Sequence, residues 1–265
     1  MERRSVRRMG RVTEEAEGLS YGSYLRLPEL LSLQQRLSDP AAHDELLFII
    51  VHQAYELWFK ELLFELESAR DRMFAGDVVG AIHLLQRAHE IERLLVEQVA
   101  VLETMSPQDF LEFRSNLSPA SGFQSVQFRE IEFVSGLKDE RIVEHLGEDD
   151  EERGRLLRRL DEPTLWDAFC ELLAGSGLPM PADDPEARRK TLVLVTREHP
   201  ELFTVSEALL THDELFAMWR LRHVLMVERQ IGSKTGTGGS SGATYLRSTL
   251  DRRFFPELWE LGSHL

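Results

Sequence analysis

The chain has 265 residues, a single cysteine and a formal net charge of -15 at pH 7. Because negative charge repels phosphate backbones, this balance argues against a nucleic-acid partner. The lone Cys170 excludes an internal disulfide framework and is typical of a reducing compartment, so we expect a cytoplasmic protein. The most apolar run near the start, Leu46–Val51, is too short to cross a bilayer, so we expect no membrane association.

The first residues run against the acidic trend, with five arginines before position 12. A secretory signal needs an apolar stretch after its positive segment, and none follows. We therefore expect residues 1–18 to be a disordered basic tail. Pro28 lies where a first-turn proline is tolerated and predicts a helix from Pro28 to Leu37.

A long helical segment follows Asp44, which we expect to cap it. Residues 45–73 contain no glycine or proline, and Gly76 ends the segment. Its partner is predicted over Val78–Met105. Four side chains recur in the first of these helices at helical spacing and share one face: Phe48, His52, Tyr55 and Phe59. A helix of this length, roughly 45 Å, suits the spine of a bundle.

A second start signal stands at Ser106-Pro107-Gln108-Asp109, where a capping serine precedes a first-position proline and an acidic residue. The short helix that it opens carries Phe110 and Arg114. Residues 118–122 read as a loop, and a helix is predicted over Phe123–Phe133.

The middle of the chain is crowded with charge over Lys138–Asp161, with an acidic tract at residues 148–152. We interpret the tract as a solvated face or a mobile excursion. Helices are predicted over Thr164–Ala174 and Pro185–Glu198. Residues of about 138–200 should therefore form a small helical insertion on the main bundle rather than a separate domain.

The last third begins with a predicted helix over Pro200–Arg229, with a break expected near Thr211-His212. Residues 232–242 are rich in glycine and serine, and helix resumes from Ala243, interrupted by Pro256. We predict an all-α fold: a large helical bundle with a small helical insertion, built as one domain over residues 19–265.

Two histidines stand on apolar helical faces, His52 and His223. An imidazole in such a wall must satisfy two ring nitrogens, so each is either a hydrogen-bonded structural residue or a ligand, and spacing does not decide. The chain has no HExxH or CxxC pattern to support a hydrolytic zinc site, and no GxSxG to support a nucleophilic serine.

Arg114 is a lone cation among aromatic residues, ahead of the Ser-Gly loop. Its planar guanidinium suits bidentate binding of a carboxylate, but a surface arginine or a structural ion pair fits the pattern as well. The loop at residues 232–242 fails the phosphate-loop pattern, because Lys234 comes too early and a helix precedes it. Its bare backbone could instead pack against a flat cofactor or a small ligand.

Four ordered segments together resemble the tryptophan 2,3-dioxygenase family. They are LSYGSYLRL at 19–27, ELLFIIVHQAYELWFKELLFEL at 45–66, SPQDFLEFRSNLSPASGFQS at 106–125 and WRLRHVLMVERQIGSKTGTGGSSGATYL at 219–246. The resemblance implies one haem b per subunit, held between helices, and a homotetramer. It also implies the first step of tryptophan catabolism by the kynurenine pathway, in which O2 cleaves the indole C2–C3 bond of L-tryptophan to give N-formyl-L-kynurenine.

The resemblance also implies individual roles. His223 matches the axial ligand of the haem iron, and His52 matches the catalytic distal histidine that accepts a hydrogen bond from the indole N–H. Arg114 matches the residue that binds the substrate carboxylate. The other implied substrate contacts are Phe48, Val51, Phe110, Leu117, Ser121, Gly122 and Thr237, with Tyr21, Tyr24 and Leu25 from an N-terminal segment that reaches a neighbouring subunit's pocket.

One position departs from the family pattern, because Phe110 stands where a tyrosine hydroxyl can assist carboxylate binding. Losing a hydrogen bond to a charged group costs roughly 1.5–3 kcal/mol when nothing replaces it. Three alternatives stay open: a related haem oxygenase that acts on a substituted indole, a non-enzymatic helical haem-binding protein, and a cofactor-free helical adaptor. The first has no use for Arg114, and the second needs neither Arg114 nor His52.

Overall fold

The computed structural model describes residues 18–145 and 150–265. The chain divides into two units, with the boundary between Gln35 and Arg36. The predicted basic tail lies outside the described residues except for Gly18, and so do the first two residues of the acidic tract at 148–152.

The described part of the first unit contains two short helices, α1 (Tyr21–Tyr24) and α2 (Leu27–Leu30). The side chains of Ser20 and Ser23 form a capping box at the start of α1. The helix predicted over Pro28–Leu37 was wrong in length, because α2 ends at Leu30 and buries no residue. Short helices are marginal without packing, which explains why the proline signal alone does not extend this one.

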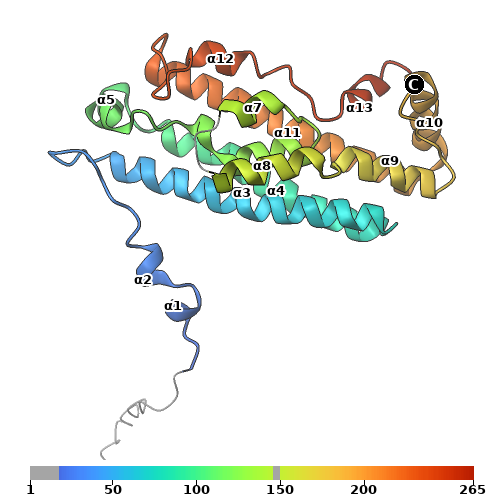
Figure 1. Cartoon of the computed structure of the whole chain (residues 1–265), viewed down its shortest axis with the longest axis horizontal. Helices are drawn as coiled ribbons and strands as arrows, with labels where there is room; N and C mark the ends of the chain where they lie inside the picture. The colour runs from blue at the N-terminus through green and yellow to red at the C-terminus, as the bar shows by residue number, and fades with distance from the viewer. Residues whose placement is uncertain (1–17, 146–149) are drawn as a thin grey trace, which may run out of the picture. The chain divides into compact units, whose positions relative to one another are not determined.

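Three long helices form the bundle of the second unit: α3 (Glu45–Phe74), α4 (Val78–Leu102) and α11 (Pro200–Ile231). They run along the long axis in Figure 1. Asp44 is the residue before α3, as predicted, but its side chain makes no capping hydrogen bond. Gly76 follows the helix with φ at 73°, a conformation that glycine adopts without strain. The break expected near Thr211-His212 was wrong, since α11 is continuous.

The core of this unit lies along the three long helices. Its fully buried side chains include Leu62 and Leu66 of α3, Leu85 of α4, and Val205 and Leu209 of α11. Burying such side chains contributes about 1.5–3 kcal/mol each, which is why amphipathic faces rather than helix propensity hold these helices together. None of the described helices combines the length and apolar character that a bilayer crossing requires.

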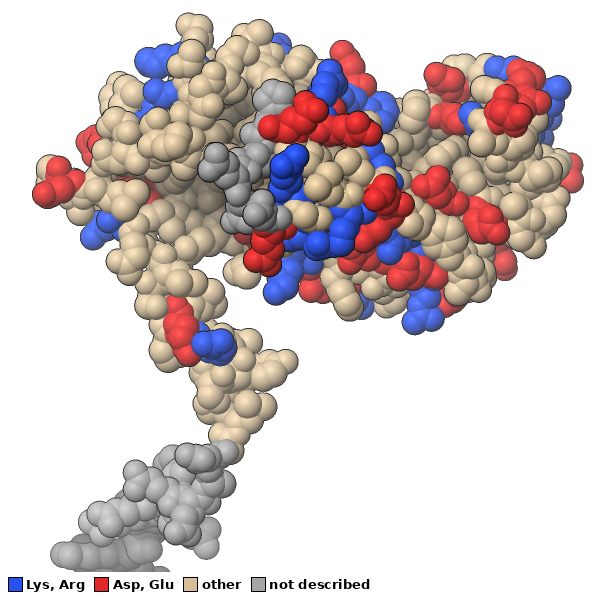
Figure 2. All heavy atoms as spheres, in the orientation of Figure 1, with Lys and Arg blue, Asp and Glu red and all other residues tan. Residues whose placement is uncertain are grey.

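The charged middle segment forms helices, which its composition alone did not predict. They are α7 (Glu140–His145) and α8 (Asp150–Asp161), and Leu156 of α8 is fully buried. Arg155 and Arg159 of α8 pair with Glu130, and Figure 2 shows acidic and basic side chains intermingled on this face. The charge therefore stabilises the docking of α8 onto its neighbours.

The predicted helices after this segment are confirmed as α9 (Leu165–Gly175) and α10 (Pro185–Glu198). Phe169 and Leu173 of α9 belong to the same core as α3, so α9 packs into the bundle. The C-terminal helix predicted from Ala243 is shorter than expected. It consists of α12 (Ala243–Arg247) and α13 (Pro256–Leu261), and Pro256 begins the second helix instead of interrupting one.

One end of the bundle carries several short elements, and Figure 1 shows α5 and α12 there, with α10 and α13 at the other end. The elements at the first end are α5 (Pro107–Phe113), the 3-10 helices η1 (Arg114–Leu117) and η2 (Gly122–Gln124), and α6 (Val126–Val134). Ser106 and Asp109 form the predicted capping box of α5. The described residues contain no β-strand, which confirms the all-α prediction.

Candidate active site

A cavity of about 280 Å³ lies between α3, α4, α6 and α11. Its walls are mainly aromatic and aliphatic, with Tyr55 and Phe59 from α3, Val99 from α4, Phe128 from α6 and Val227 from α11. The loop at residues 232–242 and the 3-10 helix η2 close the same space. A concave, mostly apolar site with a few polar groups is typical of small-molecule and cofactor binding.

His223 of α11 faces this cavity, and its ring makes no hydrogen bond to any described residue. Trp219 lies one turn earlier and stacks on the imidazole, with ring centroids 5.0 Å apart and planes 6° from parallel. Burial lowers the pKa of His223 to about 4, and the nearby His52 acts in the same direction. The imidazole is therefore neutral at pH 7, held in one plane, and free to use a lone pair.

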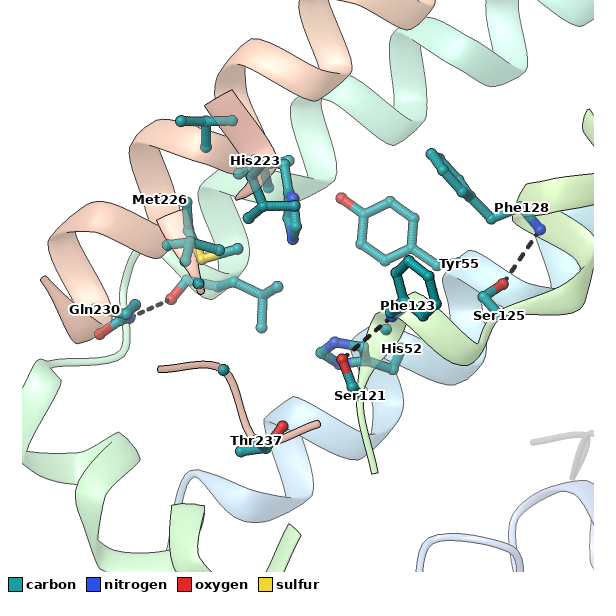
Figure 3. Close-up of a pocket in the computed structure, with 18 of the residues that line it drawn as sticks. His52, Tyr55, Ser121, Phe123, Ser125, Phe128, His223, Met226, Gln230 and Thr237 are labelled. Atoms are coloured by element: carbon teal, nitrogen blue, oxygen red, sulfur yellow. Dashed lines mark hydrogen bonds between the residues drawn. The ribbon is translucent and has the colours of Figure 1, made fainter. Parts of the chain in front are cut away.

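His52 of α3 lies on the opposite side of the cavity from His223, as Figure 3 shows. Its Nδ1–H donates to the carbonyl oxygen of Phe48 at 2.7 Å, and a carbonyl can only accept. This contact leaves Nε2 as an acceptor. Burial lowers the pKa of His52 more than the Phe48 carbonyl and Glu56 raise it, so the ring is neutral.

Arg114 begins η1 at the loop end of the cavity. Its Nη2 donates to the carbonyl oxygen of Thr235, while its Nε is buried without a hydrogen-bond partner. Phe110 lines the cavity beside it and stacks on Phe48, with centroids 5.8 Å apart. A cation with unused donor capacity in an apolar wall suits an anionic group of a ligand.

The glycine-rich loop is attached to the loop at residues 118–122. The hydroxyl of Thr237 donates to the carbonyl oxygen of Ala120 at 2.6 Å. Gly238 lies so close to this loop that an added Cβ would stand 2.6 Å from the Cβ of Ser121. Glycine is thus required for the two backbones to approach, because any side chain at this position would clash with Ser121.

Three buried charges form a chain in the cavity wall. Glu132 of α6 accepts from Nη1 of Arg129 at 2.7 Å and from Nη2 of Arg220 at 2.8 Å. The exposed fractions of these side chains are 2%, 6% and 3%, respectively. Arg220 also donates to the carbonyl oxygen of Arg252, at 3.1 Å.

No group of three or more metal-ligating side chains occurs among the described residues. A metal bound through His223 would therefore have to bring most of its own ligands. A metal held in an organic macrocycle would meet this requirement, since the macrocycle supplies most of the ligands and His223 would complete the attachment.

The comparisons with known proteins cover nearly the whole chain. The sequence profile of the tryptophan 2,3-dioxygenase family matches residues 5–173 and 189–265. The chain belongs to the tryptophan 2,3-dioxygenase family. It is 55% identical over 258 residues to a tryptophan 2,3-dioxygenase of Nocardioides sp., an alignment that covers 95% of this chain and 97% of that protein.

Two further members of the tryptophan 2,3-dioxygenase family are similar to this chain over a comparable length, at lower sequence identity. The enzyme of Herpetosiphon aurantiacus is 45% identical over 94% of this chain and 100% of its own length. The enzyme of Serratia proteamaculans is 40% identical over 96% of each chain. The middle segment of the chain contains helices α7 to α10, and within it the family profile leaves out only residues 174–188.

Most of the residues that the family resemblance assigned to the site line one cavity. They are Phe48, His52, Phe110, Arg114, Ser121, Gly122, His223 and Thr237. Two others lie outside its lining: Val51 is buried in the bundle core, and Leu117 packs beside Phe113. Tyr21, Tyr24 and Leu25 belong to the first unit, where all three side chains are exposed.

The sequence reading missed Arg129, Glu132 and Arg220, which it did not connect with the site. A signal was present, because Arg129 and Glu132 lie three residues apart in the otherwise largely apolar helix α6. Charged residues at that spacing share one helical face. Their partner Arg220 is 88 residues away from Glu132, and no local pattern connects them.

Proposed function

We propose that this chain is a tryptophan 2,3-dioxygenase that uses O2 to convert L-tryptophan into N-formyl-L-kynurenine, the first step of tryptophan catabolism by the kynurenine pathway. Membership of the family over nearly the full length supports the reaction. The observation that carries the proposal is the pair of neutral histidines, His223 and His52, on opposite sides of one apolar cavity.

The cavity residues fit haem b, one per subunit. A neutral imidazole without a protein hydrogen bond, stacked on Trp219, is a suitable axial ligand, and aromatic walls suit a flat macrocycle. When bound, haem would supply the redox-active iron with an open position for O2. His223 would hold that iron, and the surrounding apolar side chains would exclude water.

The remaining residues would select and orient the substrate. L-Tryptophan carries a carboxylate, an ammonium group and an indole N–H. Arg114 lines the cavity and supplies the cation for the carboxylate. Nε2 of His52 would accept the indole N–H, because its Nδ1–H is already committed to Phe48. Phe48 and Phe110 provide apolar walls for the indole.

Retention of Arg114 in the cavity favours an amino-acid substrate over a substituted indole that lacks a carboxylate. Such an indole would leave the guanidinium of Arg114 without an anionic partner in the cavity wall. A haem-binding protein without catalysis would likewise need no carboxylate site.

A homotetramer and a cytoplasmic location complete the proposal. Large apolar side chains are exposed on the long helices, including Ile50 and Phe64 of α3 and Leu221 of α11. Exposed apolar surface of this kind is typical of protein–protein interfaces. In such a tetramer, Tyr21, Tyr24 and Leu25 would reach a neighbouring subunit's pocket. The single cysteine is compatible with a reducing compartment.

The test is the absorption spectrum of the purified protein, followed by addition of L-tryptophan and O2 to the reduced protein. We expect a Soret band from bound haem and formation of N-formyl-L-kynurenine. His223→Ala should lose haem or activity, whereas His264→Ala, which changes an exposed histidine near the C-terminus, should lose neither. A colourless wild-type protein, or a fully active and haem-replete His223→Ala variant, would overturn the assignment.

A further inference from the structure

The chain of charges Arg129–Glu132–Arg220 lies in the cavity wall and has no part in the chemistry described so far. Glu132 stands between the two arginines, and each of its carboxylate oxygens accepts from one guanidinium. All three side chains are at least nine-tenths buried and line the cavity that also holds His223.

The charges of this cluster do not cancel. Two guanidinium groups and one carboxylate leave a net charge of about +1, because arginine stays protonated in proteins. Burial lowers the pKa of Arg220, but Glu132 opposes that shift, and the ordinary value lies far above neutral pH. The other direct contacts of the arginine head groups are the Arg252 carbonyl oxygen and the faces of four aromatic rings. Two further charges act on Arg220, the buried Asp213 and Arg252, and they shift its pKa in opposite directions, so the excess positive charge remains.

The Nε of Arg129 is buried without a hydrogen-bond partner, so its positive charge is not offset by a second acceptor. A charge in a protein interior is screened much less than one at the surface. The excess positive charge of the cluster therefore acts on whatever occupies the cavity.

We propose that the Arg129–Glu132–Arg220 cluster raises the reduction potential of the haem bound in this cavity and so favours its ferrous form. Glu132 is the positioning residue: it holds both arginines at the wall and limits the excess charge to one unit. The proposal rests on the haem-dependent function proposed above. The ferrous form is the one whose open axial position can take O2.

The positive charge raises the reduction potential because of the change of charge that accompanies reduction. One electron from an external reductant converts Fe(III) to Fe(II) without making or breaking a bond, and the bound cofactor gains one unit of negative charge. A nearby positive charge stabilises that product relative to the oxidised form. Removing the positive charge should lower the potential, and removing the negative charge of Glu132 should raise it.

The test compares the midpoint potentials of haem-loaded variants in a spectroscopic titration with dithionite. Arg129→Met keeps the Arg220–Glu132 pair and leaves the cluster neutral. We expect it to shift the ratio of reduced to oxidised protein about tenfold toward the oxidised form, which is 59 mV for one electron. Arg129→Lys retains the charge and should stay near the wild-type potential. Glu132→Gln should shift the potential in the opposite direction.

The control is Glu207→Gln, which removes one negative charge from an exposed position on the same helix as His223. The two residues are 16 positions apart, about 24 Å along the helix, so this variant should leave the potential unchanged. If Glu132→Gln does not fold, the comparison of Arg129→Met with Arg129→Lys still decides.

Equal potentials for Arg129→Met and Arg129→Lys, or shifts of the same sign for Arg129→Met and Glu132→Gln, would overturn the proposal. A purely structural role predicts loss of haem or stability in both substitutions, not opposite shifts. Failure of the proposed function is a different result, since the wild-type protein would then have no Soret band to titrate.

Discussion

Trp219 and His223 lie face to face on α11, with planes 6° from parallel and centroids 5.0 Å apart. The two residues are four positions apart, so the helix itself brings their rings together. Trp219 is packed in turn against Phe128 of α6 and Tyr55 of α3. The orientation of the His223 ring is therefore set by three helices at once.

This stack predicts that Trp219→Leu weakens haem binding about threefold to tenfold, because an aromatic pair contributes about 0.5–1.5 kcal/mol beyond its buried area. The rate of haem transfer to an acceptor protein measures the effect. Trp219→Phe is the matched control, since it keeps an aromatic face against the imidazole and should retain most of the affinity. Equal losses in both variants would mean that cavity volume, rather than stacking, holds the ring.

The hydrogen bond from His52 to Phe48 predicts an orienting role rather than an obligatory base. His52→Ala should keep its haem and lose about tenfold in kcat/KM for L-tryptophan, since one neutral hydrogen bond contributes about 0.5–1.5 kcal/mol. Steady-state turnover and the Soret spectrum are the measurements. Complete loss of turnover, with haem and substrate still bound, would show that His52 moves a proton that the reaction requires.

We predict that a hydroxyl restored at position 110 increases the affinity for L-tryptophan. Its ring packs on Phe113 with centroids 5.4 Å apart, so Phe110→Tyr keeps the packing and adds one donor beside Arg114. A hydrogen bond to a charged group contributes about 1.5–3 kcal/mol, so KM for L-tryptophan should fall about tenfold or more with little change in kcat. An unchanged KM would indicate that the new hydroxyl does not reach the carboxylate.

The buried His89 should lower the free energy of unfolding in mild acid. Its Nε2–H donates to the carbonyl oxygen of Ala208 at 2.9 Å, and burial lowers its pKa to about 4. Between that value and its ordinary pKa of about 6.5, the unfolded chain binds more protons, so the free energy of unfolding falls as pH falls. At pH 5 the loss from this residue should be about 2 kcal/mol.

Urea unfolding of the wild-type protein and of His89→Gln at pH 7 and pH 5 checks this prediction. Glutamine keeps an N–H donor for Ala208 but takes up no proton, so the variant should lose less stability between the two pH values. An identical pH dependence in both proteins would mean that the imidazole of His89 is protonated equally in the folded and unfolded states.

The boundaries of the helices show which features local sequence determines. Gly76 follows the end of α3, and the Ser106–Asp109 capping box begins α5, because caps and glycine conformations act within a few residues. The break expected at His212 was wrong because contacts distant in the sequence, rather than local ones, decide the structure there. His212 is satisfied by Glu92 at 2.6 Å and Ser135 at 2.8 Å, 120 and 77 residues away, so a polar side chain stays buried in an unbroken helix.

By itself, the sequence determined the all-α class, the main helices and, through four ordered segments, the family of this protein. Helical periodicity and family motifs are local, so they can be read along the chain. Only the tertiary structure brought His223 and His52 to opposite sides of one cavity. It also paired Glu132 with the distant Arg220, so that Arg129, Glu132 and Arg220 form a buried charged cluster in the cavity wall. In the sequence alone these three charged residues look solvent-exposed, because burial and long-range pairing are not visible there.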